Sequence, residues 1–243
     1  MKKRHLVYAI ALIVGMGACA ASAKKQAEAK PDVWKSYNVG TVLFEDKASE
    51  TKGSDIYHRI IPDAESYIKE QARTVLATLY NSPEDSITPV NKIHYTLEDI
   101  EGISAKGGGN GDVTIFYSTR HIEKSFAEND TAKLFFETRG VLLHELTHAY
   151  QLEPQGIGSY GTNRVFWAFI EGMADAVRVA NGGFDGPNAR PKGGNYMDGY
   201  RTAGYFFVWL RDNKDPEFLR KFNRSTLEAV SYTHLTLPTN SRV

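Results

Sequence analysis

The stretch GVLLHELTHAYQ, residues 140–151, carries two histidines four residues apart, with a glutamate beside the first. At about 100° per helical residue, His144 and His148 lie about 40° apart and one turn from each other, so both rings can reach one ion. Glu145 lies about 100° round from His144, where its carboxylate can address a water molecule on that ion. The spacing matches the H-E-x-x-H pattern of zinc peptidases.

The helix that carries this motif is predicted over residues 131–152 and is apolar nearly all round, which indicates burial. Two imidazoles and a carboxylate in a buried helix need partners, because unpaired buried polar groups are costly. A metal ion meets that need. The alternative is a pair of core histidines bonded to carbonyl groups, with Glu145 paired to an arginine such as Arg139 or Arg178.

A third ligand must come from elsewhere, because a catalytic zinc site takes three protein ligands and leaves one position for water. A metzincin needs Gly and His where Gln151 and Pro154 stand, so that class is excluded. A GTxxxD motif likewise fails, since its Asp position holds Phe166. Glu153 follows His148 too closely to turn back before the proline ends the helix.

The segment FWAFIEGMADAVRVA, residues 166–180, reads as a second apolar helix in which Glu171 and Asp175 share one face. Glu171 would complete a site of two histidines and one glutamate. Asp175 could accept the free N–H of a ligand histidine and fix its tautomer. The two acids could exchange these roles, or either could instead form an ion pair with Arg164 or Arg178 on the same helix.

The first 23 residues have the features of an export signal. Residues 2–4 are basic, an apolar run too short to span a bilayer follows, and ASA ends at Ala23. MGAC, ending at Cys19, would serve instead as a lipoprotein signal whose cysteine is acylated and attached to a membrane surface. We therefore expect an exported protein, periplasmic or extracellular, that is soluble or lipid-anchored. Cys19 is the only cysteine, so a chain cleaved after Ala23 cannot form a disulfide.

The charge of the chain argues against a nucleic-acid partner. The whole chain has 29 basic and 29 acidic residues. Removing the three bases of the signal leaves 26 basic against 29 acidic, a net charge of −3. No basic field is present for nucleic acid, and no second long apolar run could cross a membrane. The expected partner is a peptide or protein substrate.

Beyond the signal, one domain fits the length of the chain. Residues 24–34 are rich in Lys and Ala and indicate a flexible leader, and residues 35–230 form the predicted domain. The last residues, SYTHLTLPTNSRV at 231–243, lack any amphipathic period and resemble translated adapter sequence, so we expect a non-native tail that supplies no ligand. A native disordered tail is the alternative.

Strand candidates precede most of the helices, which is an α+β signature. The expected strands are 37–46, 92–99 and 112–119; the expected helices are 62–80, 131–152, 162–181, 198–212 and 215–228. The glycine-rich segment 100–111 indicates a hairpin or a long flexible connection, or a lid beside a cleft. It lacks the Lys-Ser/Thr ending of a phosphate loop. Residues 113–119 could be an edge strand that pairs with an extended peptide, or an interior strand.

Five quoted segments resemble the basic secretory protein family of plant and bacterial metallopeptidases, over about residues 38–225. They are IPDAESYIKEQARTVLATLY, EGISAKGGGNGDVTIFYST, GVLLHELTHAYQ, FIEGMADAVR and GYRTAGYFFVWL. The resemblance implies a zincin-like α+β fold with a mixed sheet over the active-site helix, and secreted peptidase activity. It supports His144, His148 and Glu171 as ligands and Glu145 as base. Unlike the basic plant members, this chain is slightly acidic after its signal.

The sequence therefore predicts an exported zinc metallopeptidase, an endopeptidase that uses one Zn²⁺ ion and Glu145 as general base. The oxyanion of the reaction needs a second donor, for which Tyr200 is the first candidate and Tyr205 the second, although either could be a packed core aromatic. The alternative function is an exported zincin-fold binding or scaffold module without turnover. A zinc exopeptidase lacks a visible anchor for a peptide terminus.

Overall fold

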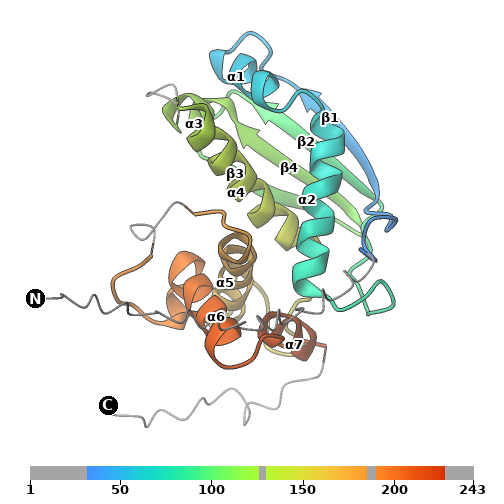
Figure 1. Cartoon of the computed structure of the whole chain (residues 1–243), viewed down its shortest axis with the longest axis vertical. Coiled ribbons are helices and arrows are strands. Elements are labelled where there is room, and N and C mark those ends of the chain that lie inside the picture. Colours follow the sequence, from blue (N-terminus) through green and yellow to red (C-terminus); the bar gives the residue numbers. More distant parts are fainter. Residues whose placement is uncertain (1–31, 126–129, 185–189, 228–243) are drawn as a thin grey trace, which may run out of the picture. The chain divides into compact units, whose positions relative to one another are not determined.

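The computed structural model describes residues 32–125, 130–184 and 190–227 (Figure 1). These residues all fall within one compact unit, Asp32–Val243. The predicted export signal, the leader up to residue 31 and the predicted tail 231–243 lie outside the described residues.

One mixed sheet of four strands, in the order β1-β2-β4-β3, forms the first half of the domain. The strands are β1 (Thr41–Asp46), β2 (Lys92–Glu98), β3 (Ser104–Gly109) and β4 (Asp112–Ser118). The first, second and fourth run parallel, and β3 pairs antiparallel with β4. The predicted α+β class with a mixed sheet is confirmed.

Helices make up most of the rest of the described chain. They are α1 (Lys52–Ile60), α2 (Ala64–Leu79), α3 (Thr119–Ser125), α4 (Thr131–Tyr150), α5 (Arg164–Ala180), α6 (Tyr200–Asn213) and α7 (Phe218–Ser225), with a short 3-10 turn at Tyr196–Asp198. All five predicted helices are present within a few residues of their expected bounds. Helices α1 and α3 were not predicted, because they are too short to show a clear apolar period.

The glycine-rich segment forms a hairpin, which was one of its expected forms. Asn110 and Gly111 make the turn between β3 and β4, with φ angles of 53° and 83°, as a two-residue hairpin loop requires. The hairpin adds β3 outside β4, so β4 lies between β2 and β3. Of the two alternatives for residues 113–119, the structure therefore has the interior strand, and β1 and β3 are the edge strands of the described sheet.

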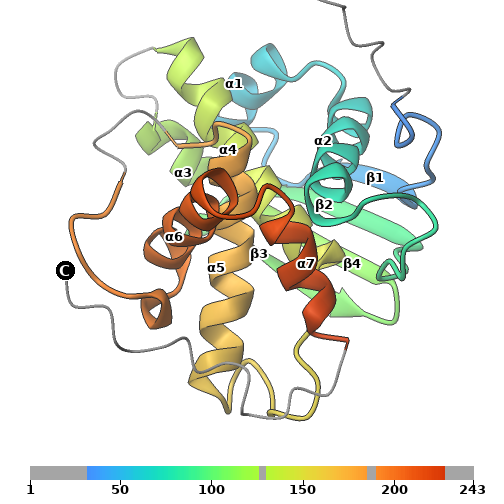
Figure 2. The same cartoon turned by 60° about the horizontal axis from the view of Figure 1, so that its bottom comes forward.

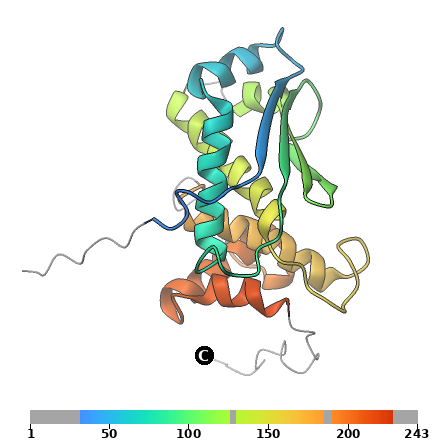
Figure 3. The same cartoon turned by 90° about the vertical axis from the view of Figure 1, so that its right-hand side faces the viewer.

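Helices α1, α2 and α4 lie against one face of the sheet, and the side view in Figure 3 shows that face covered. Alternate strand residues point into this layer and are buried against apolar side chains of α2 and α4, which explains why the sheet and helices pack. The core of this layer includes Val42, Ile93, Tyr95, Leu97, Val113, Ile115, Tyr117, Ile68, Val75, Leu79, Leu142 and Leu146.

Helices α5, α6 and α7 form a second helical group, seen in front in Figure 2. Helices α5 and α6 come very close at two glycines. A Cβ on Gly172 would lie 2.6 Å from Cβ of Ala203, and one on Gly204 would lie 2.8 Å from the backbone nitrogen of Ala176. Because α5 also packs on α4, this close approach fixes α6 relative to the histidine helix.

Candidate metal centre

Two capped helices position the candidate ligands. The side chain of Asp130 accepts the backbone N–H of Lys133 at the start of α4, and Asn163 accepts those of Val165 and Phe166 at the start of α5. Helix α4 packs between β3 and α5, so its polar side chains face either the strand or the second helix. The caps and this packing fix which way the polar groups of α4 and α5 point.

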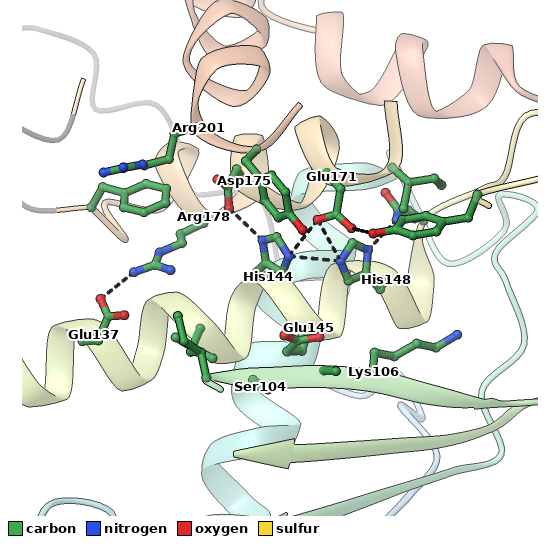
Figure 4. Close-up of a pocket in the computed structure, with 18 of the residues that line it drawn as sticks. Ser104, Lys106, Glu137, His144, Glu145, His148, Glu171, Asp175, Arg178 and Arg201 are labelled. Carbon is green, nitrogen blue, oxygen red and sulfur yellow. Dashed lines mark hydrogen bonds and ion pairs between the residues drawn. The ribbon is translucent and has the colours of Figure 1, made fainter. Parts of the chain in front are cut away.

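The structure brings His144, His148 and Glu171 together (Figure 4). Nε2 of His144 lies 3.0 Å from Nε2 of His148. Oε2 of Glu171 lies 3.3 Å from the first of these nitrogens and 3.7 Å from the second. One ligand atom from each residue thus falls in a group spanning at most 4.8 Å.

These three atoms fit a metal ion. Ligands about 2.0–2.2 Å from zinc at tetrahedral angles are about 3.3 Å from one another, and the observed separations bracket that value. Oε2 of Glu171 is buried, and its polar neighbours are Nε2 of His144 and Nε2 of His148. When both nitrogens are unprotonated, this oxygen has no hydrogen-bond donor among the described residues, and a cation would provide the missing partner. Two imidazole nitrogens and one carboxylate oxygen also form a common donor set for a catalytic metal.

Asp175 contacts His144 on the side away from this convergence. Nδ1 of His144 donates to Oδ1 of Asp175 at 2.7 Å, which leaves Nε2 to face the other ligands. Burial lowers the pKa of His144, but hydrogen bonds to Asp175 and Glu171 outweigh burial and raise the pKa to about 10. Burial and the charge of His144 lower the pKa of His148 to about 3. In the metal-free site these surroundings favour the protonated form of His144 and the neutral form of His148.

Gln151 contacts Nδ1 of His148, as Asp175 contacts Nδ1 of His144. Its side-chain amide lies 2.8 Å from Nδ1 of His148, and its buried Oε1 has no hydrogen-bond partner in the part of the chain that the structure describes. A histidine that binds a metal through Nε2 carries its hydrogen on Nδ1 and needs an acceptor there. Rotating the Gln151 amide by half a turn exchanges its oxygen and nitrogen, so that Oε1 accepts the hydrogen on Nδ1 of His148. Both groups then have a partner, and this is the orientation that the hydrogen-bond network favours.

Glu145 points away from the three candidate ligands and toward β3 (Figure 4). It lines the same cleft, and only 6% of its surface is exposed. Burial raises the pKa of Glu145, although the charge on His144 and contacts with Ser104 and Lys106 of β3 oppose the rise. A carboxylate with a raised pKa is better matched to accepting a proton near neutral pH.

The two tyrosines named from sequence lie in different places. Tyr200 lines the cleft, and its ring stacks near that of His144 with centroids 6.1 Å apart. Tyr205 lies beside Phe184 and lines a neighbouring pocket. Tyr160, which no sequence pattern indicated, donates its hydroxyl hydrogen to Oε1 of Glu171 at 2.6 Å.

The arginines that could have neutralised the site are engaged elsewhere. Arg178 donates to Glu137 and to the carbonyl of Gly183. Arg164 donates to the carbonyl of Met197, and the remaining candidate, Arg139, donates to Gln71 and Asn181. None of them contacts Glu145, Glu171 or Asp175, so the alternative ion pairs expected from sequence are not formed.

One cleft of about 1080 Å³ is lined by the three candidate ligands together with Glu145, Gln151, Asp175, Tyr160 and Tyr200. One wall consists of the helices α4, α5 and α6, and the other is the edge strand β3, from Ser104 to Lys106. Within the described part of the chain, no helix is both long and apolar enough to cross a membrane.

Comparison with known proteins agrees with this arrangement. The family model BSP, described as peptidase of plants and bacteria, matches residues 39–238. The chain belongs to this family, the basic secretory protein family. Searches of curated proteins and of solved structures found no match.

Proposed function

We propose that the protein is an exported zinc-dependent metallopeptidase, an endopeptidase with a zincin-like fold. The main support is that His144, His148 and Glu171 converge on one point and that Glu145 is buried in the same cleft. Membership of a peptidase family supports the reaction class. The leading 23 residues, with their basic start and short apolar run, support export.

In this proposal His144, His148 and Glu171 would hold the ion, with Asp175 and Gln151 fixing the two imidazoles. A bound zinc ion supplies Lewis-acid chemistry, since it acidifies water and polarises a carbonyl group. Glu145 accepts a proton from the attacking water and delivers it to the nitrogen of the leaving amine. No covalent intermediate with the protein is required.

Tyr200 is the proposed donor to the oxyanion. About half of it is exposed, it lines the cleft, and its backbone φ of 41° lies in the left-handed region. A tyrosine held in that region is strained, and such strain is concentrated at functional positions. Tyr160 is already bonded to Glu171, which makes it a better positioning residue than a donor to substrate.

The edge strand β3 is the proposed binding site for the substrate backbone. It lines the cleft opposite the candidate ligands and has a free edge, because its only partner in the described sheet is β4. An extended peptide can add to such an edge through main-chain hydrogen bonds, which give affinity without demanding particular side chains. Pairing with an extended peptide, considered from sequence for residues 113–119, is therefore proposed for β3 instead.

The proposal is tested by measuring bound zinc and cleavage of a mixed peptide library with the wild type and Glu145→Gln. We expect about one zinc per chain in both proteins and a loss of cleavage by about 10²–10⁴-fold in the variant. Glu70→Gln, an exposed change on α2, serves as the matched control and should cleave like the wild type. Zinc binding without cleavage by the wild type would instead favour a binding or scaffold module.

A further inference from the structure

The cleft has a cationic end that the proposed chemistry does not use. Figure 4 shows Arg178 and Arg201 beyond His144, and Lys106 on the opposite side, beyond His148. Both arginines line the cleft. They lie on the same aromatic ring: the guanidinium carbons of Arg178 and Arg201 are 3.9 and 5.8 Å from the centroid of Phe184.

Of the two arginines, only Arg178 forms an ion pair with a described residue. Arg178 is buried and forms an ion pair with Glu137, at 2.7 Å, and a hydrogen bond with the Gly183 carbonyl. A Cβ on Gly140 would lie 2.4 Å from Nε of Arg178, so the helix packing also confines this side chain. Its charge is satisfied within the protein, and its role is structural.

Arg201 is exposed and forms no ion pair with any described residue. Its guanidinium lies near the ring of Phe184, and its charge also acts on the hydroxyl of Tyr205. The acids closest to the cleft centre are engaged elsewhere, since Asp175 bonds His144 and Glu171 faces the two histidines. The guanidinium therefore presents an unused positive charge to the cleft. Guanidinium groups bind carboxylates with paired, charge-assisted hydrogen bonds.

The direction of β3 tells which part of a peptide would reach Arg201. Along β3 the chain runs from Ser104 to Lys106, away from Arg201 (Figure 4). A peptide that adds antiparallel to β3 runs the other way, so its C-terminal part points toward Arg201. Antiparallel pairing is also the commoner arrangement overall.

From these observations we infer that Arg201 binds a carboxylate of the peptide substrate on the C-terminal side of the bond that is cleaved. The inference rests on the proposed peptidase function and adds a substrate class, peptides with an acidic group at that end. The carboxylate can come from an Asp or Glu side chain or from the free C-terminus of a short peptide, and both present the same chemistry.

The test compares cleavage profiles of the zinc-loaded wild type, Arg201→Gln, Arg201→Glu and Arg211→Gln on one peptide library. Arg211 is the matched control, because it lies on the same helix and does not line the cleft. We expect the wild type and Arg211→Gln to prefer Asp or Glu over Asn or Gln, C-terminal to the cleaved bond, by about two- to fivefold, the range for an exposed ion pair. Arg201→Gln should lose this preference and Arg201→Glu should favour Lys or Arg.

Two further experiments are needed. One distinguishes a terminal carboxylate from a side-chain carboxylate, and the other tests the inference on Arg201 separately from the peptidase proposal. Short peptides with free and amidated C-termini distinguish a terminal carboxylate from a side chain. Zinc-loaded Glu145→Gln, with and without Arg201→Gln, is titrated with labelled acidic and neutral peptides, so that binding is measured without turnover. A wild type that cleaves nothing would defeat the peptidase proposal alone. Identical profiles for all four proteins, or equal affinities for acidic and neutral peptides, would overturn the inference on Arg201.

Discussion

The two walls of the cleft are built differently. The helical wall presents side chains: the three candidate ligands, Asp175 and Gln151 behind the two histidines, and the aromatic and basic groups of α6. The strand wall is the first half of β3, from Ser104 to Lys106, and the strand continues beyond the cleft into three consecutive glycines. The difference suggests a division of work in which the helices hold the ion and the strand holds the substrate main chain. Changes on the two walls should therefore affect different measurements.

The largest expected effect is a fall in the free energy of unfolding of the metal-free protein as pH rises, caused by His144 on the helical wall. Hydrogen bonds to Asp175 and Glu171 outweigh burial and raise the pKa of folded His144 to about 10, whereas an unfolded histidine titrates near ~6.5. Its stabilising contribution is fully present below the unfolded pKa and is lost as pH rises through the folded one. Between pH ~7 and ~9, the free energy of unfolding of the chelator-treated protein should fall by about 1.4 kcal/mol per unit.

Urea unfolding at several pH values measures this slope. The zinc-loaded protein is the control, because an ion on Nε2 takes the place of the proton and should remove the slope. A chelator-treated protein whose stability does not change over this range would show that His144 does not carry the proton.

The next effect concerns the support of His148. Gln151→Ala should weaken zinc affinity by about 10- to 100-fold, because His148 loses the acceptor that fixes its tautomer. Gln151→Glu should restore most of the affinity, since a carboxylate also accepts from Nδ1. Competition with a chromogenic chelator measures both, and Gln155→Ala, an exposed glutamine in the following loop, is the matched control. Equal affinities for Gln151→Ala and Gln155→Ala would remove Gln151 from the site.

The smallest effects are expected on the strand wall. Gly108 has a φ of +85°, and a Cβ there would lie 2.0 Å from the carbonyl oxygen of Asp112. Gly108→Ala should therefore cost about 1–3 kcal/mol of stability. A Cβ on Gly109 meets nothing within 4 Å, so Gly109→Ala should stay within about 0.5 kcal/mol of the wild type. Thermal melting measures both, and a change in zinc affinity of either variant would contradict the division between the walls.

The parts of this protein that follow from local periodicity could be predicted from sequence. His144 and His148 lie one turn apart on α4, and Glu171 and Asp175 lie one turn apart on α5, so helical geometry alone placed each pair on one face. Apolar surroundings on both helices indicated that these faces are buried together. The fold class followed from the order of strands and helices.

The parts that depend on contacts between distant segments could not be predicted. Strand β3 lacks the branched and aromatic residues of a strand, because its glycines serve the hairpin and its register comes from pairing with β4. Tyr160 reaches Glu171 from the loop before α5, and no local pattern marks it. Arg178 is buried and paired with Glu137 on α4, whereas Arg201 is exposed, and this difference depends on contacts between segments far apart in the sequence.

If α4 and α5 hold one metal ion between them, a crystal structure of the zinc-loaded protein will show it, with anomalous data collected on both sides of the zinc edge. We expect a single zinc peak bound by Nε2 of His144, Nε2 of His148 and a carboxylate oxygen of Glu171, with Glu145 not bound to the ion. A peak at another place, or an ion on the two histidines with the Glu171 carboxylate turned away, would show that the two helices do not share an ion.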